Sequence, residues 1–315
     1  MQNLFYNAEE NRMRALFRVL LFIILFFLAS GLPLLIPIEP ISYLLQSVLS
    51  FGVFYLMIRF TDKRPWQFSG LQLNSTWAKE CIAGIAIAAF VMGLIFLGVW
   101  GTGGLEITGF GWERNTERSW LIPLLIFLVQ MMSVGFYEEV MARGYLIPNI
   151  TEGFTFDNFS ARKATVFAIL ISSSFFGILH AGNPNATLTA VSNIILAGVM
   201  LAIPFVVTGR LALSIGLHFS WNFFQGGVFG FRVSGMEIRS SIIQVQQGGP
   251  DWWTGGAFGP EAGVIGILGI LLIIIMSVGY LKFTGVQLNL NKVFSSPYKK
   301  LKNADQEVQK TNVDN

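Results

Sequence analysis

The chain is short of charge. Only 12% of its 315 residues are charged, 53% are hydrophobic, and the mean hydropathy is +0.59, whereas soluble proteins average about 25% charged residues. This composition excludes a water-soluble globular protein and indicates an integral membrane protein. The formal net charge is only +3, and the basic residues stand at the ends of apolar runs, so nucleic-acid binding is not expected.

Cysteine and histidine are also scarce. The one cysteine, Cys81, excludes an internal disulfide framework and a structural zinc site built on cysteine. The two histidines, His180 and His218, both lie at or within hydrophobic segments. No signal peptide is expected, because the first apolar run is long and lacks a clear small-residue cleavage site.

Apolar runs of membrane-spanning length follow one another with short connections. A span needs roughly 20 apolar residues, and the chain offers eight candidates. They are Leu16–Ile38, Ile41–Phe60, Cys81–Trp100, Leu121–Ile147, Thr165–His180, Leu188–Val207, Leu211–Gly230 and Ala262–Phe283. The sequence therefore predicts an all-α, polytopic membrane helical bundle of about eight transmembrane helices. We expect one membrane domain over residues 1–302 and a polar, disordered tail over 303–315.

Lysine and arginine gather on alternate sides of these spans. The enriched connections carry Arg12, Arg14, Arg18, Arg59, Lys63, Arg64, Lys79, Arg162, Lys163, Arg210, Lys292, Lys299, Lys300, Lys302 and Lys310. The positive-inside rule then predicts both termini in the cytoplasm and a multi-pass protein of the cell membrane. Pro33 and Pro37 are expected to end or kink the first span. The long loop 231–261 clusters glycine and proline, which favour turns, and its Trp252 and Trp253 suit a membrane surface.

The most informative segment lies inside the fourth apolar run, where Glu138 and Glu139 are adjacent. An ionisable side chain at that depth marks a functional site by default. Consecutive helical residues point about 100° apart, so the two glutamates do not share one task. Glu139 and Arg143 are spaced i, i+4 and can pair on one face, which leaves Glu138 available. The alternative is that both glutamates are hydrated at the cytoplasmic end of the span, but the apolar stretch 145–147 follows them.

Two further spans carry polar pairs at the same spacing. Phe176 and His180 share one helix face, and so do His218 and Asn222. Taken singly, His180 is explained as a helix cap or surface residue, and His218 with Asn222 as an interhelical hydrogen-bonding pair. Together with Glu138 they supply, on three spans, the groups needed to activate water and to stabilise an oxyanion.

These three motifs resemble those of the CAAX-protease and bacteriocin-processing (CPBP, or Abi) family. Its members are intramembrane endopeptidases related to the type 2 CAAX prenyl endopeptidase, and the resemblance covers about residues 120–230. It implies that Glu138 is the general base, that His180 binds or polarises the water, and that His218 and Asn222 stabilise the oxyanion. The residues that it implies as supporting are Glu139, Arg143 and Phe176. The implied partners are the lipid bilayer and a peptide or protein substrate, for which membrane-anchored chains are candidates.

The cofactor is either none or a divalent metal such as zinc. Glu138, His180 and His218 would permit a three-ligand site with water in the fourth position, and they equally permit a metal-free, glutamate-activated water. No His-Glu-x-x-His helix is present. The i, i+4 pairing of His218 with Asn222 is more typical of paired donors than of a ligand beside an unrelated residue, which favours the metal-free site.

Two other functions fit the same residues. A proton-coupled transporter could relay protons through Glu138, His180 and His218, but the chain lacks the paired halves typical of transporters. A non-catalytic protein that binds a peptide, such as a bacteriocin-immunity protein, would retain the motifs. A rhomboid-type protease is disfavoured because Gly-x-Ser-Gly is missing. With straight spans, His180 would lie more than ~15 Å from Glu138 along the membrane normal. The protease hypothesis therefore needs a tilted span five that starts later, a segment around Ala181–Asn185 that re-enters the bundle, or a different position of span four.

Overall fold

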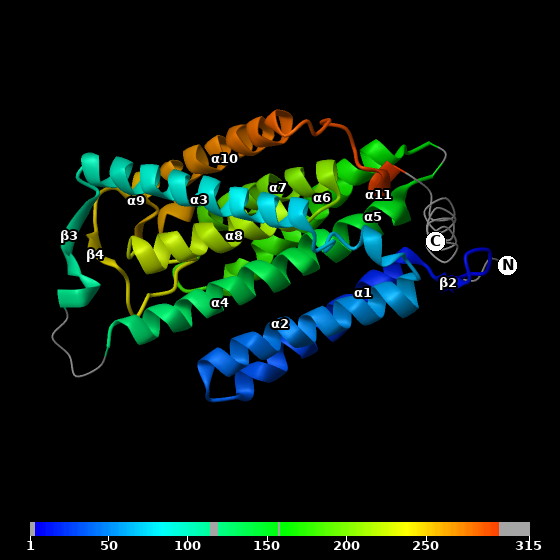
Figure 1. The fold of residues 1–315 in the computed structure, drawn as a ribbon, viewed down its shortest axis with the longest axis horizontal. Coiled ribbons are helices and arrows are strands. Elements are labelled where there is room, and N and C mark those ends of the chain that lie inside the picture. The colour runs from blue at the N-terminus through cyan, green and yellow to red at the C-terminus, as the bar shows by residue number, and fades with distance from the viewer. Residues whose placement is uncertain (1–3, 114–118, 157, 296–315) are drawn as a thin grey trace.

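The computed structural model describes residues 4–113, 119–156 and 158–295, which form an elongated bundle of helices with two small sheets (Figure 1). The α-helices are α1 (Ala15–Gly31), α2 (Glu39–Leu56), α3 (Ser75–Gly101), α4 (Leu121–Glu139), α5 (Ile147–Phe154), α6 (Ala161–Leu179), α7 (Leu188–Thr208), α8 (Ala212–Phe223), α9 (Asp251–Thr254), α10 (Val264–Phe283) and α11 (Lys292–Ser295). The π-helices are η2 (Met57–Asp62), η5 (Val140–Leu146) and η7 (Phe224–Val228). The 3-10 helices are η1 (Leu32–Leu35), η3 (Trp66–Phe68), η4 (Gly111–Glu113), η6 (His180–Gly182), η8 (Gly256–Phe258) and η9 (Pro260–Ala262).

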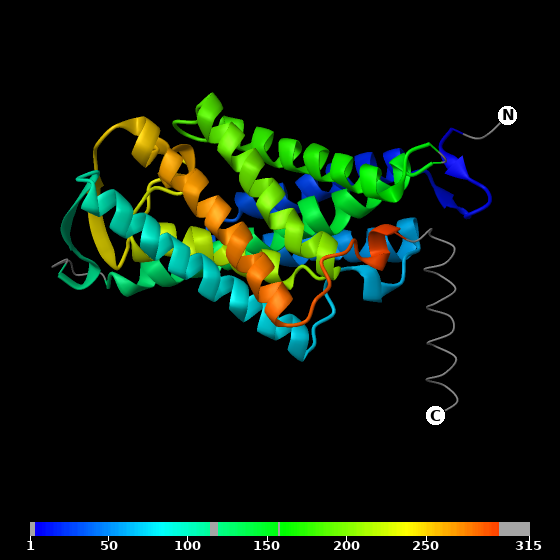
Figure 2. The same cartoon turned by 90° about the horizontal axis from the view of Figure 1, so that it is seen from above.

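The multi-pass membrane bundle is confirmed. Within the described residues, seven helices are long and apolar enough to cross a membrane. They are Ala15–Leu35, Glu39–Asp62, Ser75–Gly101, Leu121–Phe154, Ala161–Gly182, Leu188–Thr208 and Val264–Phe283. The remaining predicted span, Leu211–Gly230, is shorter than expected, with 12 residues in α8 and 5 in η7. It runs through the middle of the bundle between α3, α4 and α7 (Figures 1 and 2).

The two ends of the described chain lie at the same end of the bundle. The sheet of β1 (Tyr6–Asn7) and β2 (Arg12–Met13) and the helix α11 both stand there (Figure 1). This placement agrees with an even number of crossings, while the cytoplasmic side remains a prediction. The predicted tail 303–315 and the basic residues from Lys299 onward lie outside the described residues. α1 ends at Gly31, immediately before the 3-10 turn that contains Pro33.

The fourth span is longer than predicted. It continues past Ile147 as one 34-residue helix through η5 and α5 to Phe154. Glu138 and Glu139 therefore lie near the middle of this helix and not toward its end, which removes the separation from His180 expected for straight, shorter spans. The π-helix η5 begins directly after Glu139, and short π segments inside α-helices occur frequently at functional sites.

Glycines bring α8 close to the helices on either side. A methyl group at Gly135 of α4 would lie 2.9 Å from the backbone nitrogen of Phe219, and one at Gly216 would clash with the carbonyl oxygen of Cys81 on α3. Small residues at helix crossings allow such backbone contact in membranes. Gly135 stands one turn before the two glutamates, so this contact sets them against α8.

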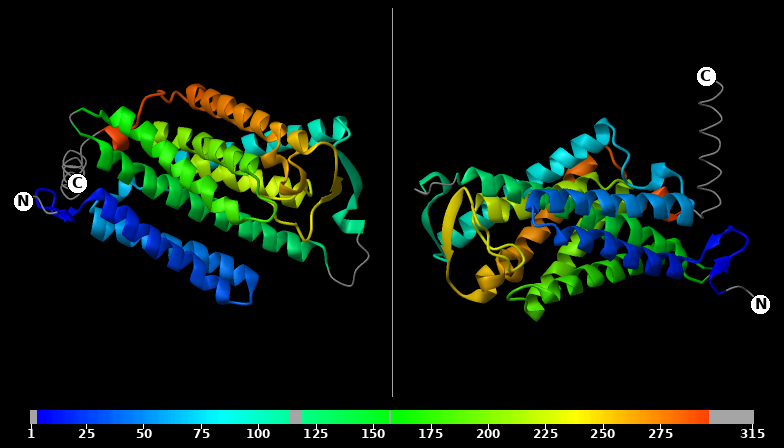
Figure 3. Two further views of the ribbon diagram at one scale, coloured as in Figure 1. Left: turned by 180° about the vertical axis from the view of Figure 1, so that it is seen from behind. Right: turned by 90° about the horizontal axis from the view of Figure 1, so that it is seen from below.

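A buried ion network fastens α1 and α2 to α5. Arg18 pairs with Asp62 at 2.9 Å, and Arg12 and Arg64 pair with Glu152 at 2.8 and 2.7 Å. The three arginine side chains are at most 6% exposed. The sequence indicated these arginines only as orientation signals. In the structure they anchor the α1–α2 hairpin, which packs on one side of the bundle (Figure 3).

A small sheet lies at the other end of the bundle and was not predicted. β3 (Leu105–Phe110) pairs antiparallel with β4 (Ile243–Gln247), with a register shift between Ile107 and Gly109. The sequence predicted only turns over 231–261. After β4 the chain passes through α9, where Trp253 donates to Thr102 Oγ1 at 3.0 Å, and then returns into the bundle at η9.

We expect Gly135→Ala to destabilise the protein and to lower any activity. The added methyl group meets backbone atoms that cannot rotate away, and overpacking of this kind costs about 1–3 kcal/mol. Thermal unfolding in detergent measures the change. Gly52→Ala on α2 is the control, because a methyl group there has no atom within 4 Å. A Gly135→Ala melting temperature no lower than that of Gly52→Ala would contradict close α4–α8 packing.

Candidate active site

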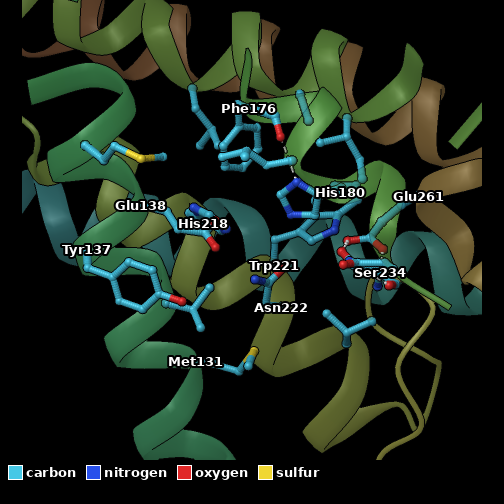
Figure 4. A pocket seen from close by; sticks show the side chains of 18 of the residues that line it. Met131, Tyr137, Glu138, Phe176, His180, His218, Trp221, Asn222, Ser234 and Glu261 are labelled. Atoms are coloured by element: carbon cyan, nitrogen blue, oxygen red, sulfur yellow. Dashed lines mark hydrogen bonds and ion pairs between the residues drawn. The ribbon is translucent and has the colours of Figure 1, made fainter. Parts of the chain in front are cut away.

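One cavity collects the polar residues predicted from the three motifs. It has a volume of about 510 Å³, within the ~300–1,000 Å³ typical of ligand sites. Glu138, Phe176, His180, His218 and Asn222 all line it (Figure 4). α4, α6, η6 and α8 supply these side chains. Most of the remaining wall is apolar and comes from α1, α4, α6, α7 and α8.

Behind the cavity wall, Glu139 is the centre of a buried hydrogen-bonded group. Its Oε1 accepts from Arg143 Nη1 at 2.9 Å and from His218 Nδ1 at 2.8 Å. The Glu139 and Arg143 side chains are 0% and 1% exposed. The predicted Glu139–Arg143 pair is therefore confirmed. The bond to His218 was not predicted, because i, i+4 spacing predicts contacts within one helix and not contacts between two helices.

Phe176 fills the space between the charged group and the two histidines. The Arg143 guanidinium carbon lies 4.5 Å from its ring centroid, and Arg143 Nη2 donates to the carbonyl oxygen of Gly198 at 3.1 Å. The centroids of His180 and His218 lie 4.8 and 5.9 Å from that of Phe176. The ring thus gives Arg143 a cation–π contact and fixes the positions of both imidazoles.

His218 lies between the two glutamates. Its Nδ1 faces Glu139, and its Nε2 lies 3.7 Å from Glu138 Oε2. Because a carboxylate only accepts hydrogen bonds, Nδ1 carries a proton. Nε2 then holds a lone pair in the neutral ring and a proton in the imidazolium. Within the described part of the chain, the buried Oε2 of Glu138 has no hydrogen-bond partner, although its side chain is 17% exposed toward the cavity.

His180 is oriented by its own helix. Its Nδ1 lies 2.8 Å from the carbonyl oxygen of Phe176, so Nδ1 is the donor and Nε2 is left for the cavity (Figure 4). Asn222 stands one turn after His218, and its amide borders the same space. The structure thus brings together all four residues predicted as catalytic, on three different helical segments.

A three-ligand metal site does not fit this arrangement. Among the described residues, no group of three or more His, Cys, Asp or Glu side chains is placed to hold a metal ion. Glu138, His180 and His218 line the cavity, but their side chains do not converge on one ligand position.

Sequence patterns missed a second acidic group in the cavity wall, formed by Glu261 and Ser234. Ser234 donates to the Glu261 carboxylate through its backbone N–H at 2.6 Å and through Oγ at 3.2 Å. Burial raises the pKa of the Glu261 carboxyl above its usual range, while the bonds from Ser234 and Gln225 and the nearby His180 act against this increase. The only sequence signal was an acid inside a glycine-rich loop, which is normally solvated.

A smaller cavity of about 270 Å³ adjoins the first. Five residues line both cavities, namely Tyr43, Gln130, Met131, Val233 and Met236. At the border of the smaller cavity, Arg239 pairs with Glu39 at 2.8 Å, with side chains 75% and 39% exposed. This ion pair connects the loop after α8 with the beginning of α2.

Comparison with protein families finds one match in the segment that forms this site. Residues 119–224 match the model of the type II CAAX prenyl endopeptidase Rce1-like family. The match confirms the resemblance seen in the motifs and covers about a third of the chain, from the beginning of α4 to the end of α8. The CAAX-type family supports an intramembrane protease that acts on peptides, in a multi-pass membrane protein. No curated protein and no solved structure matches the chain.

We expect Glu139→Ala and Arg143→Ala each to destabilise the protein by about 3–5 kcal/mol, because each leaves the other charge buried and unpaired. The double variant should lose less than the sum of the single losses. Unfolding of all four proteins in detergent gives the coupling. The exposed pair Arg232–Glu237 is the control, with an expected coupling below about 1 kcal/mol. Additive losses for Glu139 and Arg143 would contradict the buried pair.

Proposed function

We propose that the protein is an intramembrane endopeptidase that cleaves a peptide bond with a water molecule activated by Glu138 and histidine. The observation that carries the proposal is the set Glu138, His180, His218 and Asn222 on one cavity, with His218 oriented by Glu139. The match of residues 119–224 to a CAAX-type family supports the same reaction class.

Glu138 is the general base in this proposal. Its side chain is 17% exposed and lines the cavity, where the carboxylate can accept a proton from water as the water oxygen attacks the substrate carbonyl. His180 Nε2 accepts the second hydrogen of the same water and aligns it. The proton then held by Glu138 passes to the leaving amine, so the glutamate acts first as base and then as acid.

His218 and Asn222 stabilise the tetrahedral oxyanion. The Asn222 amide donates in any state of the site, whereas His218 Nε2 donates only when the ring carries both protons. Glu139, which is bonded to Nδ1 of this ring, keeps its negative charge after Glu138 has taken up the proton, and this charge offsets the positive charge that the ring then carries. Preorganised donors at such positions act mainly on the transition state.

Glu138→Gln is expected to abolish cleavage and to leave the protein folded. The amide is nearly isosteric with the acid but cannot accept the proton, and loss of a general base reduces the rate by about 10²–10⁴-fold. Turnover of a labelled peptide by purified protein in detergent measures this loss. Glu106→Gln, at an exposed position on β3, is the control and should retain wild-type turnover. Near-normal turnover by Glu138→Gln would reject Glu138 as the base.

Asn222→Ala should lower kcat by about 10²–10³-fold and leave KM nearly unchanged, because it removes one oxyanion donor. Steady-state kinetics on the same peptide separate the two constants. Gln130→Ala is the comparison, since Gln130 is also an amide in the cavity wall but lies two turns before Glu138. If Asn222→Ala raises KM at unchanged kcat, the amide binds the substrate in the ground state.

A further inference from the structure

Glu261 is a rigidly held carboxylate in the cavity wall that the proposed mechanism does not use. It is 8% exposed and lies on η9, where the chain returns into the bundle after β4 (Figure 4). Asn193 of α7 donates to its carbonyl oxygen at 2.9 Å. Asn183, three residues after His180, donates to the carbonyl oxygen of Ser234 at 3.0 Å. These bonds hold Glu261 and Ser234 beside the segment that carries His180.

The Glu261 carboxylate keeps room for one more donor. A carboxylate offers about four acceptor positions on its two oxygens. The backbone N–H and the hydroxyl of Ser234 occupy two of them, one on each oxygen, while the Gln225 side-chain nitrogen donates to the carbonyl oxygen of Arg232. Because Glu261 lines the cavity, a group bound there can donate to a remaining position.

The cavity has an excess of negative charge. Among the described residues that line it, Glu138 and Glu261 are acidic and none is lysine or arginine. The nearby Arg143 does not offset them, because it is paired with Glu139. At the adjoining smaller cavity the charges are paired, Glu39 with Arg239 and Glu237 with Arg232. No lysine or arginine in the described wall of the main cavity therefore offsets these two carboxylates, and interactions between charges are stronger there than in water.

Glu261 and Ser234 lie outside the segment that matches the family, which ends at residue 224. The residues of the proposed chemistry lie inside it. Glu261 and Ser234 thus belong to the part of the wall outside the matched segment, and they line the same cavity as the reacting groups.

We propose that Glu261 is a specificity-determining residue, through which the cavity selects peptide segments with a lysine or arginine side chain near the cleaved bond. This inference rests on the proposed endopeptidase function. The basic side chain donates to the free acceptor position of Glu261 and offsets the charge of the two glutamates. An acidic side chain at the same place is repelled by both.

Cleavage tests the proposal in wild-type protein. A short, uncharged alanine–leucine–serine peptide is compared with versions that carry lysine, glutamine or glutamate at each position in turn. At one position, lysine should raise kcat/KM by about 10-fold over glutamine, as expected for a hydrogen bond to a charged group, and glutamate should lower it. In Glu261→Gln this difference should disappear while the uncharged peptide is still cut. Glu106→Gln should keep the difference.

Binding separates this inference from the proposed function. Affinities of the same labelled peptides are measured with Glu138→Gln and with Glu138→Gln/Glu261→Gln, neither of which needs to cleave. The single variant should bind the lysine peptide about 10-fold more tightly than the glutamine peptide, and the double variant should bind both equally. The role of Glu261 is overturned if the single variant binds both peptides equally or binds no peptide. It is also overturned if the double variant still prefers the lysine peptide. Absent or Glu138-independent cleavage by the wild type overturns the proposed function instead.

Discussion

A charged side chain inside an apolar bundle must have a partner, and this requirement organises the centre of the protein. Glu139 is fully buried, and its Oε1 bonds both Arg143 on its own helix and His218 on α8. Removing one charge of such a group leaves the other desolvated and unpaired. The same two bonds neutralise Glu139, fix the ring of His218 and leave Glu138 as the acid that borders the cavity. The buried Glu139–Arg143 pair and the cavity residues Glu138 and His218 therefore depend on each other.

Much of the architecture follows from one-dimensional patterns. Apolar runs located the seven membrane-length helices of the described residues, although the third begins at Ser75 and not at Cys81. The i, i+4 spacing correctly placed Arg143 beside Glu139 and Phe176 beside His180. The main error was the end of span four, which was placed at Ile147 although the helix continues to Phe154. Hydropathy could not detect that continuation, because α5 is a short amphipathic segment with polar residues such as Asn149 and Glu152.

The missing part concerns contacts between elements far apart in sequence. The Glu139–His218 bond joins residues 79 positions apart, and its geometry depends on the close crossing of α4 and α8 at Gly135. Glu261 reaches the cavity because the chain after α8 forms β4, which pairs with β3, and then returns to the bundle. There Asn193 and Ser234 hold Glu261 by hydrogen bonds. Neither contact leaves a periodic signal in the sequence. The first depends on how two helices pack, and the second depends on the path of a loop.

The two ends of the α1–α2 hairpin are fastened very differently. At one end, Arg18 and Asp62 form a buried pair that salt screens little, and Glu152 joins two more arginines there. At the other, Glu39 is linked to Arg239 by an exposed pair, a type worth about 0–1 kcal/mol and weakened by salt. Raising the ionic strength therefore weakens the polar link at the end of the hairpin beside the smaller cavity and leaves the link at its other end nearly unchanged.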